Sequence, residues 1–498
     1  MGRFAPSPAG RDLAWLGMGS ETRFSVLPFR PFWSLKLRSY DMPEIFSPGP
    51  RPPAGSASLL AAFLVGFASA PLSGQHQASP PPSAYALEGV TVVHGDGGRE
   101  EGVTLVVRSG MVERLGPDAE VPEDARVLEG DDLHVYPGIV DPYGRASMEL
   151  PSPETEGVPA WDPPREVQGL TPSVRVADHL TATGASLEDE RIRGVVASAV
   201  FPPRGPLPGT GAFLLHRKDA EAPRDLVLDP AVGVGAAFEG SRVGYPGTLF
   251  GVMALLRQAF ADAEHRQILR AEYDADPSGI DRPGRDQDFE VIRQLAAGEY
   301  PVFFRANEAQ AVRRVLALSE ELGFTPVVVG GGEAWRVADE LRARNVPVVV
   351  SADLPGPEEW DPEDDGELDP AAHRERERLE NLYANAGRLR DAGVTVAFTG
   401  HLGSADAREG ARKAVEYGMS EADALRALTS VPAELLGAPE LGRVQEGGSA
   451  TFVVANGPLL DEDTAILHTF VAGRPTAGAD PGMDGNAEAQ GSSSGGGR

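Results

Sequence analysis

The pattern of hydrophobic and polar positions changes twice along the chain. From Tyr85 to Tyr136, short alternating segments separated by turn residues predict strands, as in GVTVVHGDGG, GVTLVVRSG and LHVYPG. The same pattern returns near the other end, in LGRVQEGGSATFVVANG and AILHTFVAGRP. Each set holds too few strands to form a stable sheet alone, so we expect both ends to join in one small β-sandwich.

Between these ends, apolar strands alternate with amphipathic helices. PVFF (301–304) precedes a helix with one apolar face, for which we expect Asn307 as N-cap and Gly323 at the C-terminus. The segments TPVVVGG, VPVVVS and GVTVAFTG continue the pattern. Strands that are apolar throughout are typical of a parallel sheet covered by helices. The span 137–437 therefore predicts an α/β fold with a (β/α)8 TIM-like barrel, and a doubly wound open sheet is the alternative.

The N-terminal segment predicts export. The apolar run at about 57–70 is too short to span a bilayer and is followed by small residues, which is typical of a signal peptide. The run lies deep in the chain if translation begins at Met1, and Met42 is an alternative start; a buried helix is the competing interpretation. We expect a periplasmic or secreted protein with no transmembrane anchor in the mature chain.

These patterns together predict the domain organisation. The leader, signal peptide and Pro-rich linker occupy 1–84, and the β-sandwich is formed by 85–136 and 438–476, on either side of the barrel at 137–437. The Gly/Ser-rich tail at 477–498 is predicted to be disordered.

Charge and cysteine content exclude several classes of function. The formal net charge of -29 argues against a nucleic-acid partner, because phosphate binding requires clustered cations. The absence of cysteine removes thiol catalysis, zinc-thiolate sites and disulfides.

The order of these segments resembles the amidohydrolase superfamily, in particular its imidazolonepropionase-like branch. The resemblance covers about 85–475 and rests on three stretches in the family's order: GVTLVVRSGMVERLG, then YPGIVD as the first barrel strand, then GMSEADALRALTSVPAELLGAPELGRVQEGGSATFVVANG. The stretch YPGTLFGVMALLRQAFADA (245–263) is similar to one in a secreted, ligand-poor branch that often sits beside, or fused to, an intact copy. The resemblance implies a hydrolase of non-peptide C–N bonds with zinc at the C-terminal mouth of the barrel.

The metal ligands that the resemblance implies are missing here. Tyr143 and Arg145 stand where the first strand would carry two histidines, and Arg305 and Gly331 replace the later ones. His401 falls at or within one position of the family's aspartate. No two of the nine histidines lie within ten residues of each other, so no short metal-binding motif is present. We therefore expect no bound zinc or other cofactor.

Two residues are candidates for catalysis, and two arginines are candidates for binding. His401 ends a barrel strand and Asp141 ends the first one, although Asp141 could instead pair with Arg145 or Arg305. These two arginines at the mouth would repel a divalent cation and attract a carboxylate or phosphate.

Three functions remain open on the sequence. The first is a non-catalytic, exported protein that pairs with or stabilises an intact relative, since fold does not imply function. The second is a hydrolase of amide or cyclic amide bonds with a rebuilt site that uses His401, Asp406, Tyr143 or Glu308. The third is a binding protein for an anion or small metabolite.

Overall fold

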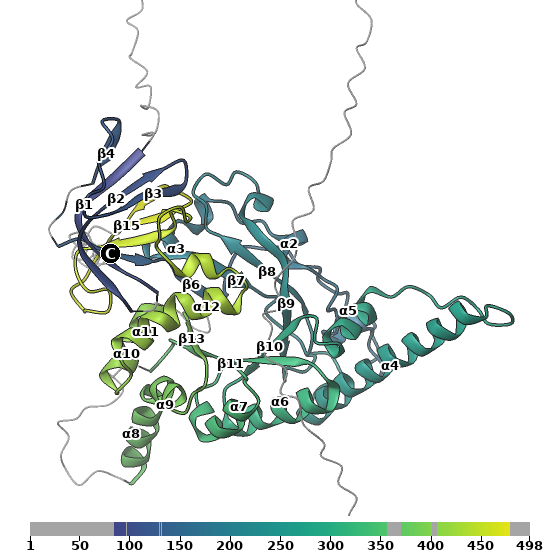
Figure 1. Cartoon of the computed structure of the whole chain (residues 1–498). Coiled ribbons are helices and arrows are strands. Elements are labelled where there is room, and N and C mark those ends of the chain that lie inside the picture. The colour runs from purple at the N-terminus through teal and green to yellow at the C-terminus, as the bar shows by residue number, and fades with distance from the viewer. Residues whose placement is uncertain are drawn as a thin grey trace, which may run out of the picture. The chain divides into compact units, whose positions relative to one another are not determined.

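The computed structural model describes residues 84–355, 370–400 and 406–478, apart from Asp96, Glu129 and Asp131 (Figure 1). The expected signal peptide and linker, His401 and nearly all of the expected disordered tail lie outside these residues. Within the described ranges, no helix is both long enough and apolar enough to cross a membrane.

One sheet combines strands from both ends of the described chain. Its strand order is β16-β15-β14-β5-β1-β2-β3, with β4 paired to β1. The junction is antiparallel pairing of β14 with β5, where Phe452 lies opposite Pro137. Joining of the two ends is as expected, whereas a two-layered sandwich stays a prediction. The strands are β1 (Ala84–Val93), β2 (Arg99–Arg108), β3 (Met111–Gly116), β4 (Ala125–Val127), β5 (His134–Pro137), β14 (Phe452–Ala455), β15 (Ile466–Val471) and β16 (Arg474–Ala477).

The second sheet is a nearly closed barrel of eight strands in chain order, β6 to β13. Its first and last strands meet where the Gly400 N–H donates to Asp141 Oδ2 at 3.2 Å and the Thr399 hydroxyl donates to the Tyr143 carbonyl at 3.2 Å. The strands are β6 (Ile139–Gly144), β7 (Val195–Val200), β8 (Gly209–Leu215), β9 (Val227–Ala237), β10 (Pro301–Ala306), β11 (Thr325–Gly330), β12 (Val348–Ser351) and β13 (Val396–Thr399).

One strand departs from the all-parallel arrangement that the apolar pattern predicts. β8 runs antiparallel to both β7 and β9. The connections 201–208 and 216–226 are too short to hold a crossover helix, which a parallel strand requires. The other neighbouring pairs in the barrel are parallel.

Helices cover the outer face of the barrel (Figure 1). A cluster of buried side chains, Phe303 among them, fills its interior. Along β10, Phe304 packs outward in a cluster with Val312 and Leu316 of α6, whereas Phe303 belongs to the inner cluster. This alternation is the period of two that strand geometry imposes. The helices are α1 (Arg165–Gln168), α2 (Val176–His179), α3 (Glu188–Ile192), α4 (Leu249–Ala275), α5 (Gln287–Ala296), α6 (Ala309–Leu322), α7 (Ala338–Ala343), α8 (Pro370–Tyr383), α9 (Asn385–Asp391), α10 (Ala407–Glu416), α11 (Glu421–Leu428) and α12 (Ser430–Leu435).

The start of α6 differs from the sequence expectation. Its N-cap is Glu308. The Ala309 N–H, which has no acceptor within the helix, donates to the Glu333 carboxylate at 3.0 Å. Asn307, the expected N-cap, does not cap the helix, and its Oδ1 accepts from Gly332 N in the loop after β11 at 2.8 Å. The predicted C-terminal glycine is confirmed, because Gly323 has the left-handed φ of 82°.

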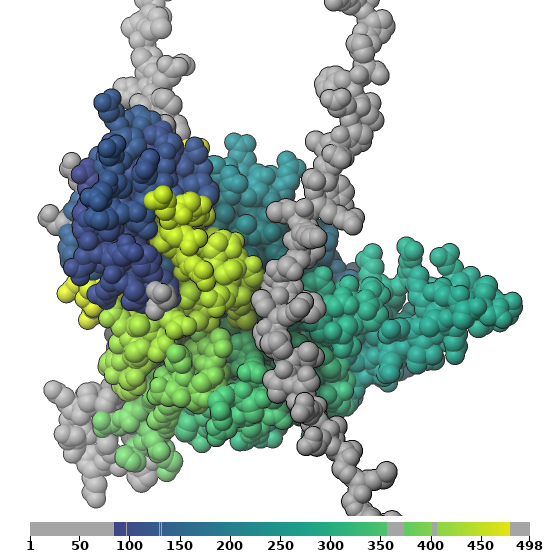
Figure 2. Space-filling view, viewed as in Figure 1, coloured from purple at the N-terminus to yellow at the C-terminus, as the bar shows by residue number. Residues whose placement is uncertain are grey.

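The first half of the long helix α4 is partly buried, and its second half is largely exposed. Its buried side chains lie between Val252 and Ala263, and most residues after Ala263 are exposed. In Figure 2 the last turns of α4 stand clear of the neighbouring elements.

Candidate functional site

An aromatic stack occupies the barrel mouth at the end of β6. The Tyr143 ring lies 5.1 Å from the Phe201 ring with an interplanar angle of 13°, and Phe201 lies 4.6 Å from Phe303. Glycines on adjacent strands make room for these rings. A Cβ at Gly211 would come within 2.4 Å of Phe201, and one at Gly233 within 2.9 Å of Phe303. The position of the first expected metal ligand is therefore part of the packed interior.

An ion pair lies beside this stack. Arg305, at the end of β10, contacts the Glu239 carboxylate just beyond β9 at 2.9 Å. Burial raises the pKa of the Tyr143 hydroxyl; nearby Arg305 opposes this rise and Glu239 adds to it. Tyr143 thus stays a neutral phenol at neutral pH, and most of the Arg305 charge is matched by Glu239.

Asp141 acts as a structural acceptor in the described contacts. Its side chain is 2% exposed. Besides Gly400 N, it accepts the Tyr143 N–H at 2.8 Å through Oδ1. The carboxylate therefore holds the turn that presents Tyr143 and fastens β6 to the end of β13.

The loop after β11 leaves no room for a ligand at Gly331. This residue has a φ of +57°, and a Cβ there would lie 2.6 Å from Val348 Cγ1. Its carbonyl accepts from Asn385 Nδ2 at 2.9 Å, and its N–H donates to the Ala306 carbonyl. Asn385 is itself fully buried, so the glycine conformation is fixed from several sides.

The remaining predicted site residues are spread around the mouth. Arg145 is exposed, one residue beyond β6, and His401 lies outside the described residues. Glu308 is exposed at the start of α6. Asp406 caps α10 by accepting from Arg408 N at 2.9 Å. Among the contacts described, none brings Arg145 and Arg305 together as the anion hypothesis expects.

The residues at these positions do not fit zinc. A guanidinium cannot donate an electron pair to a metal, glycine has no side chain, and the tyrosine is neutral and stacked. Within 84–355, 370–400 and 406–478, no three His, Cys, Asp or Glu side chains are grouped so that they could hold an ion.

Sequence reasoning missed two features of the site. Glu239 follows β9 by two residues, and a carboxylate just after a barrel strand is a signal that could have identified it. Phe201 gave no comparable signal, because its contacts with Tyr143 and Phe303 are made between strands far apart in the chain.

Comparison with known proteins supports the architecture. No family model matches the sequence, and no curated protein does so either. An amidohydrolase structure from Thermotoga maritima is similar with a TM-score of 0.62 and 22% identity, over 79% of this chain and 100% of that chain. Another amidohydrolase has a TM-score of 0.46 and 17% identity, over 80% of this chain and 99% of that chain. An adenosine deaminase from Xanthomonas campestris with bound zinc has a TM-score of 0.43 and 16% identity, over 79% and 93%.

The match takes in the whole length of the Thermotoga structure, with a TM-score above 0.5. The resemblance that the sequence motifs indicate is thus confirmed for the fold. This chain has the same fold as the Thermotoga amidohydrolase structure.

Proposed function

We propose that this protein is an exported, non-catalytic member of the amidohydrolase fold that pairs with or stabilises an intact relative. The observation that carries the proposal is the Tyr143–Phe201–Phe303 stack at the mouth. Aromatic rings packed against glycines fill the place where a hydrolase of this fold would hold its metal and admit its substrate.

Two further observations support the proposal that this site no longer binds a metal ion. The Arg305–Glu239 pair places a permanent cation where a neutral ligand would be needed. Gly331 is held in a left-handed conformation that accepts no larger side chain without backbone movement. The alternative, a rebuilt hydrolase, would use His401, Asp406, Tyr143 or Glu308. Of these, Asp406 and Glu308 lie at helix starts and Tyr143 is part of the stack.

A partner role is tested by expression together with an intact relative from the same organism. We expect one complex in size-exclusion chromatography with light scattering, and a higher melting temperature of the relative in that complex, because binding to the native state stabilises it. Two separate peaks at micromolar concentration, with an unchanged melting temperature of the relative, would contradict the role.

Export is expected from the apolar run at about 57–70. N-terminal sequencing of the protein made in its own organism should find a mature chain that begins between Ala70 and Ala84. A cytosolic chain that begins at Met1 would contradict this expectation.

Metal content should be low. Protein purified without chelator is expected to hold well under one equivalent of zinc, manganese or iron, because the described mouth residues lack a ligand set. Mass spectrometry of the metals measures this directly. Chelators should change neither the melting temperature nor any hydrolysis of amide, imide or dipeptide substrates. A tightly held stoichiometric metal, with activity that His401→Ala abolishes, would favour the rebuilt hydrolase.

Restoring the first ligand pair should not restore activity. The double variant Tyr143→His, Arg145→His still has Arg305 and Gly331 at the later positions, and neither supplies a metal ligand. We expect no hydrolysis of the same substrates with added zinc. The matched control is Tyr143→Phe, which keeps the stack and should melt like the parent. Zinc-dependent turnover by the double variant would show that the remaining site is intact.

A further inference from the structure

A groove of about 800 Å³ lies next to the barrel mouth. It is bounded by the loops after β7 and β9 and by segments before and after α1. Its walls are largely apolar and rich in proline, and Glu239 of the mouth ion pair is one of its lining residues. This volume is in the range of small-molecule sites. The apolar lining includes Leu150, Pro151, Val167, Val174, Pro202 and Pro208.

The groove is held in shape by close backbone contacts. Gly169 and Gly205 lie against each other, and a Cβ on Gly205 would come within 2.8 Å of the Gly169 carbonyl oxygen. Leu207 N donates to the Gly169 carbonyl at 3.0 Å, and Thr171 N donates to the Leu207 carbonyl at 2.9 Å. A ligand would therefore meet a preformed surface and would not have to order it.

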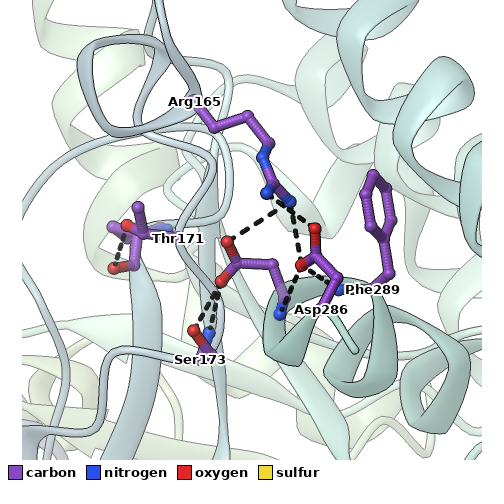
Figure 3. A network of polar contacts seen from close by, with 7 residues as sticks. Arg165, Thr171, Ser173, Asp286 and Phe289 are labelled. Carbon is purple, nitrogen blue, oxygen red and sulfur yellow. Dashed lines mark hydrogen bonds and ion pairs between the residues drawn. The ribbon is translucent and has the colours of Figure 1, made fainter. Parts of the chain in front are cut away.

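A polar network fastens one wall of the groove to α5 (Figure 3). Arg165 donates to both oxygens of Asp286, at 3.1 and 2.7 Å, and lies 3.4 Å from Asp288. Ser173 donates to Asp288 through its N–H and its hydroxyl, at 3.1 and 2.6 Å. Burial alone would raise the pKa of Asp286, but the hydrogen bond and charge of Arg165, with the Phe289 N–H and Arg266, together hold the pKa below its ordinary value. The carboxylate stays ionised, and this wall is rigid at neutral pH.

The charges along the groove favour a negatively charged ligand. Arg204 and Arg242 both line it and are exposed, and neither forms an ion pair with another described residue. Glu239 is matched by Arg305, and Glu166 lies close enough to Arg165 to stabilise its charged form. Two guanidinium groups thus remain for a ligand, beside an apolar wall.

We propose that this groove binds a small carboxylate with an apolar body, through Arg204 and Arg242. A guanidinium suits a carboxylate because it presents two parallel N–H donors. The apolar wall suits an acyl or aromatic group in place of a bare anion. The inference does not depend on the proposed partner role, and it assigns anion recognition to Arg204 and Arg242 in place of Arg145 and Arg305.

The test uses calorimetry and ligand-observed NMR on the mature protein. The probes are N-benzoylglycine, N-acetylphenylalanine and N-acetylproline, each as the free carboxylate and as the primary amide, with inorganic phosphate for comparison. We expect at least one carboxylate to bind with a Kd of about 1 mM or tighter. It should bind roughly tenfold more tightly than its amide, since the charge-assisted hydrogen bonds are lost in the amide.

The variants Arg204→Gln and Arg242→Gln should each weaken that binding by about tenfold, with the melting temperature unchanged. Arg224→Gln is the matched control, because Arg224 is 88% exposed and lies at the opposite end of β9. It should bind like the parent.

Three results would overturn the inference. The first is that no carboxylate binds up to about 10 mM, roughly ten times the expected Kd. The second is that a carboxylate and its amide bind with equal affinity. The third is that phosphate binds as tightly as the acyl amino acids. The carboxylate could belong to a peptide C-terminus or to a free metabolite. A short peptide ending in phenylalanine, compared with its amidated form, distinguishes these two sources. Competition by the free-acid peptide alone identifies a peptide C-terminus, and failure to compete identifies a free metabolite.

Discussion

A chain that ends after Leu436 is expected to aggregate instead of folding. The truncation removes β14 to β16, and β14 pairs directly with β5. Phe452, Val454 and Phe470 are fully buried in one cluster with Leu87 and Leu105 from the N-terminal strands. Losing side chains of this kind costs about 1.5–3 kcal/mol each in buried apolar surface. The truncation also exposes β5 as a hydrophobic edge, which favours pairing between molecules.

Size-exclusion chromatography, circular dichroism and dye binding to exposed apolar surface measure this outcome. The matched control ends after Gly478, beyond β16, and should unfold at the same temperature as the full mature chain. A soluble Leu436 truncation with a cooperative unfolding transition would mean that the barrel does not need the C-terminal strands.

Much of the architecture follows from local pattern. The alternating segments at both ends and the apolar strands after 300 correspond to strands, because their hydrophobic periods match the faces that are buried. Ser420 is the N-cap of α11, and its hydroxyl accepts from Asp423 N three residues on, at 3.1 Å. These features depend on neighbours within a few residues, which the sequence displays directly.

Features that depend on distant segments were not accessible in this way. The apolar pattern of β8 is the same whether it runs parallel or antiparallel, and only its short connections distinguish the two. The acceptor for the first N–H of α6, that of Ala309, is Glu333, which belongs to a different loop. The stack likewise joins Tyr143 of β6 to Phe201, directly after β7 and 58 residues further along the chain.

Tyr143 and Arg305 lie near each other in the structure, but the residues that pair with them come from other segments. Tyr143 and Arg305 were expected at the mouth in place of metal ligands, and the structure places both beside Glu239. The sequence left the Arg305 charge to an incoming anion or to Asp141, because it could not show that Glu239 pairs with Arg305. The apolar filling of the mouth also required Gly211, whose missing side chain is informative only once Phe201 is known to face it.

Replacing Asp141 with alanine is expected to be among the most destabilising single changes in the barrel. Alanine leaves the Tyr143 and Gly400 N–H groups without their acceptor in a site that is 2% exposed. Each hydrogen bond to a charged group contributes about 1.5–3 kcal/mol, so we expect the free energy of unfolding to fall by about 3–5 kcal/mol. Asparagine offers one acceptor oxygen and sets an NH₂ against the other N–H, so Asp141→Asn should cost roughly half as much.

The control for this change is Asp229→Ala. Asp229 also accepts an N–H two residues on, from Ala231 at 2.8 Å, but it lies on β9 and is only partly buried. Its loss should cost about 1 kcal/mol. Urea unfolding monitored by fluorescence and circular dichroism measures all three variants against the parent, with an unchanged slope expected for each. If Asp141→Ala proves no more destabilising than Asp229→Ala, the contact between β6 and the end of β13 does not hold the barrel closed. If it shows the larger loss, the Asp141 carboxylate within β6 has a structural role in this chain.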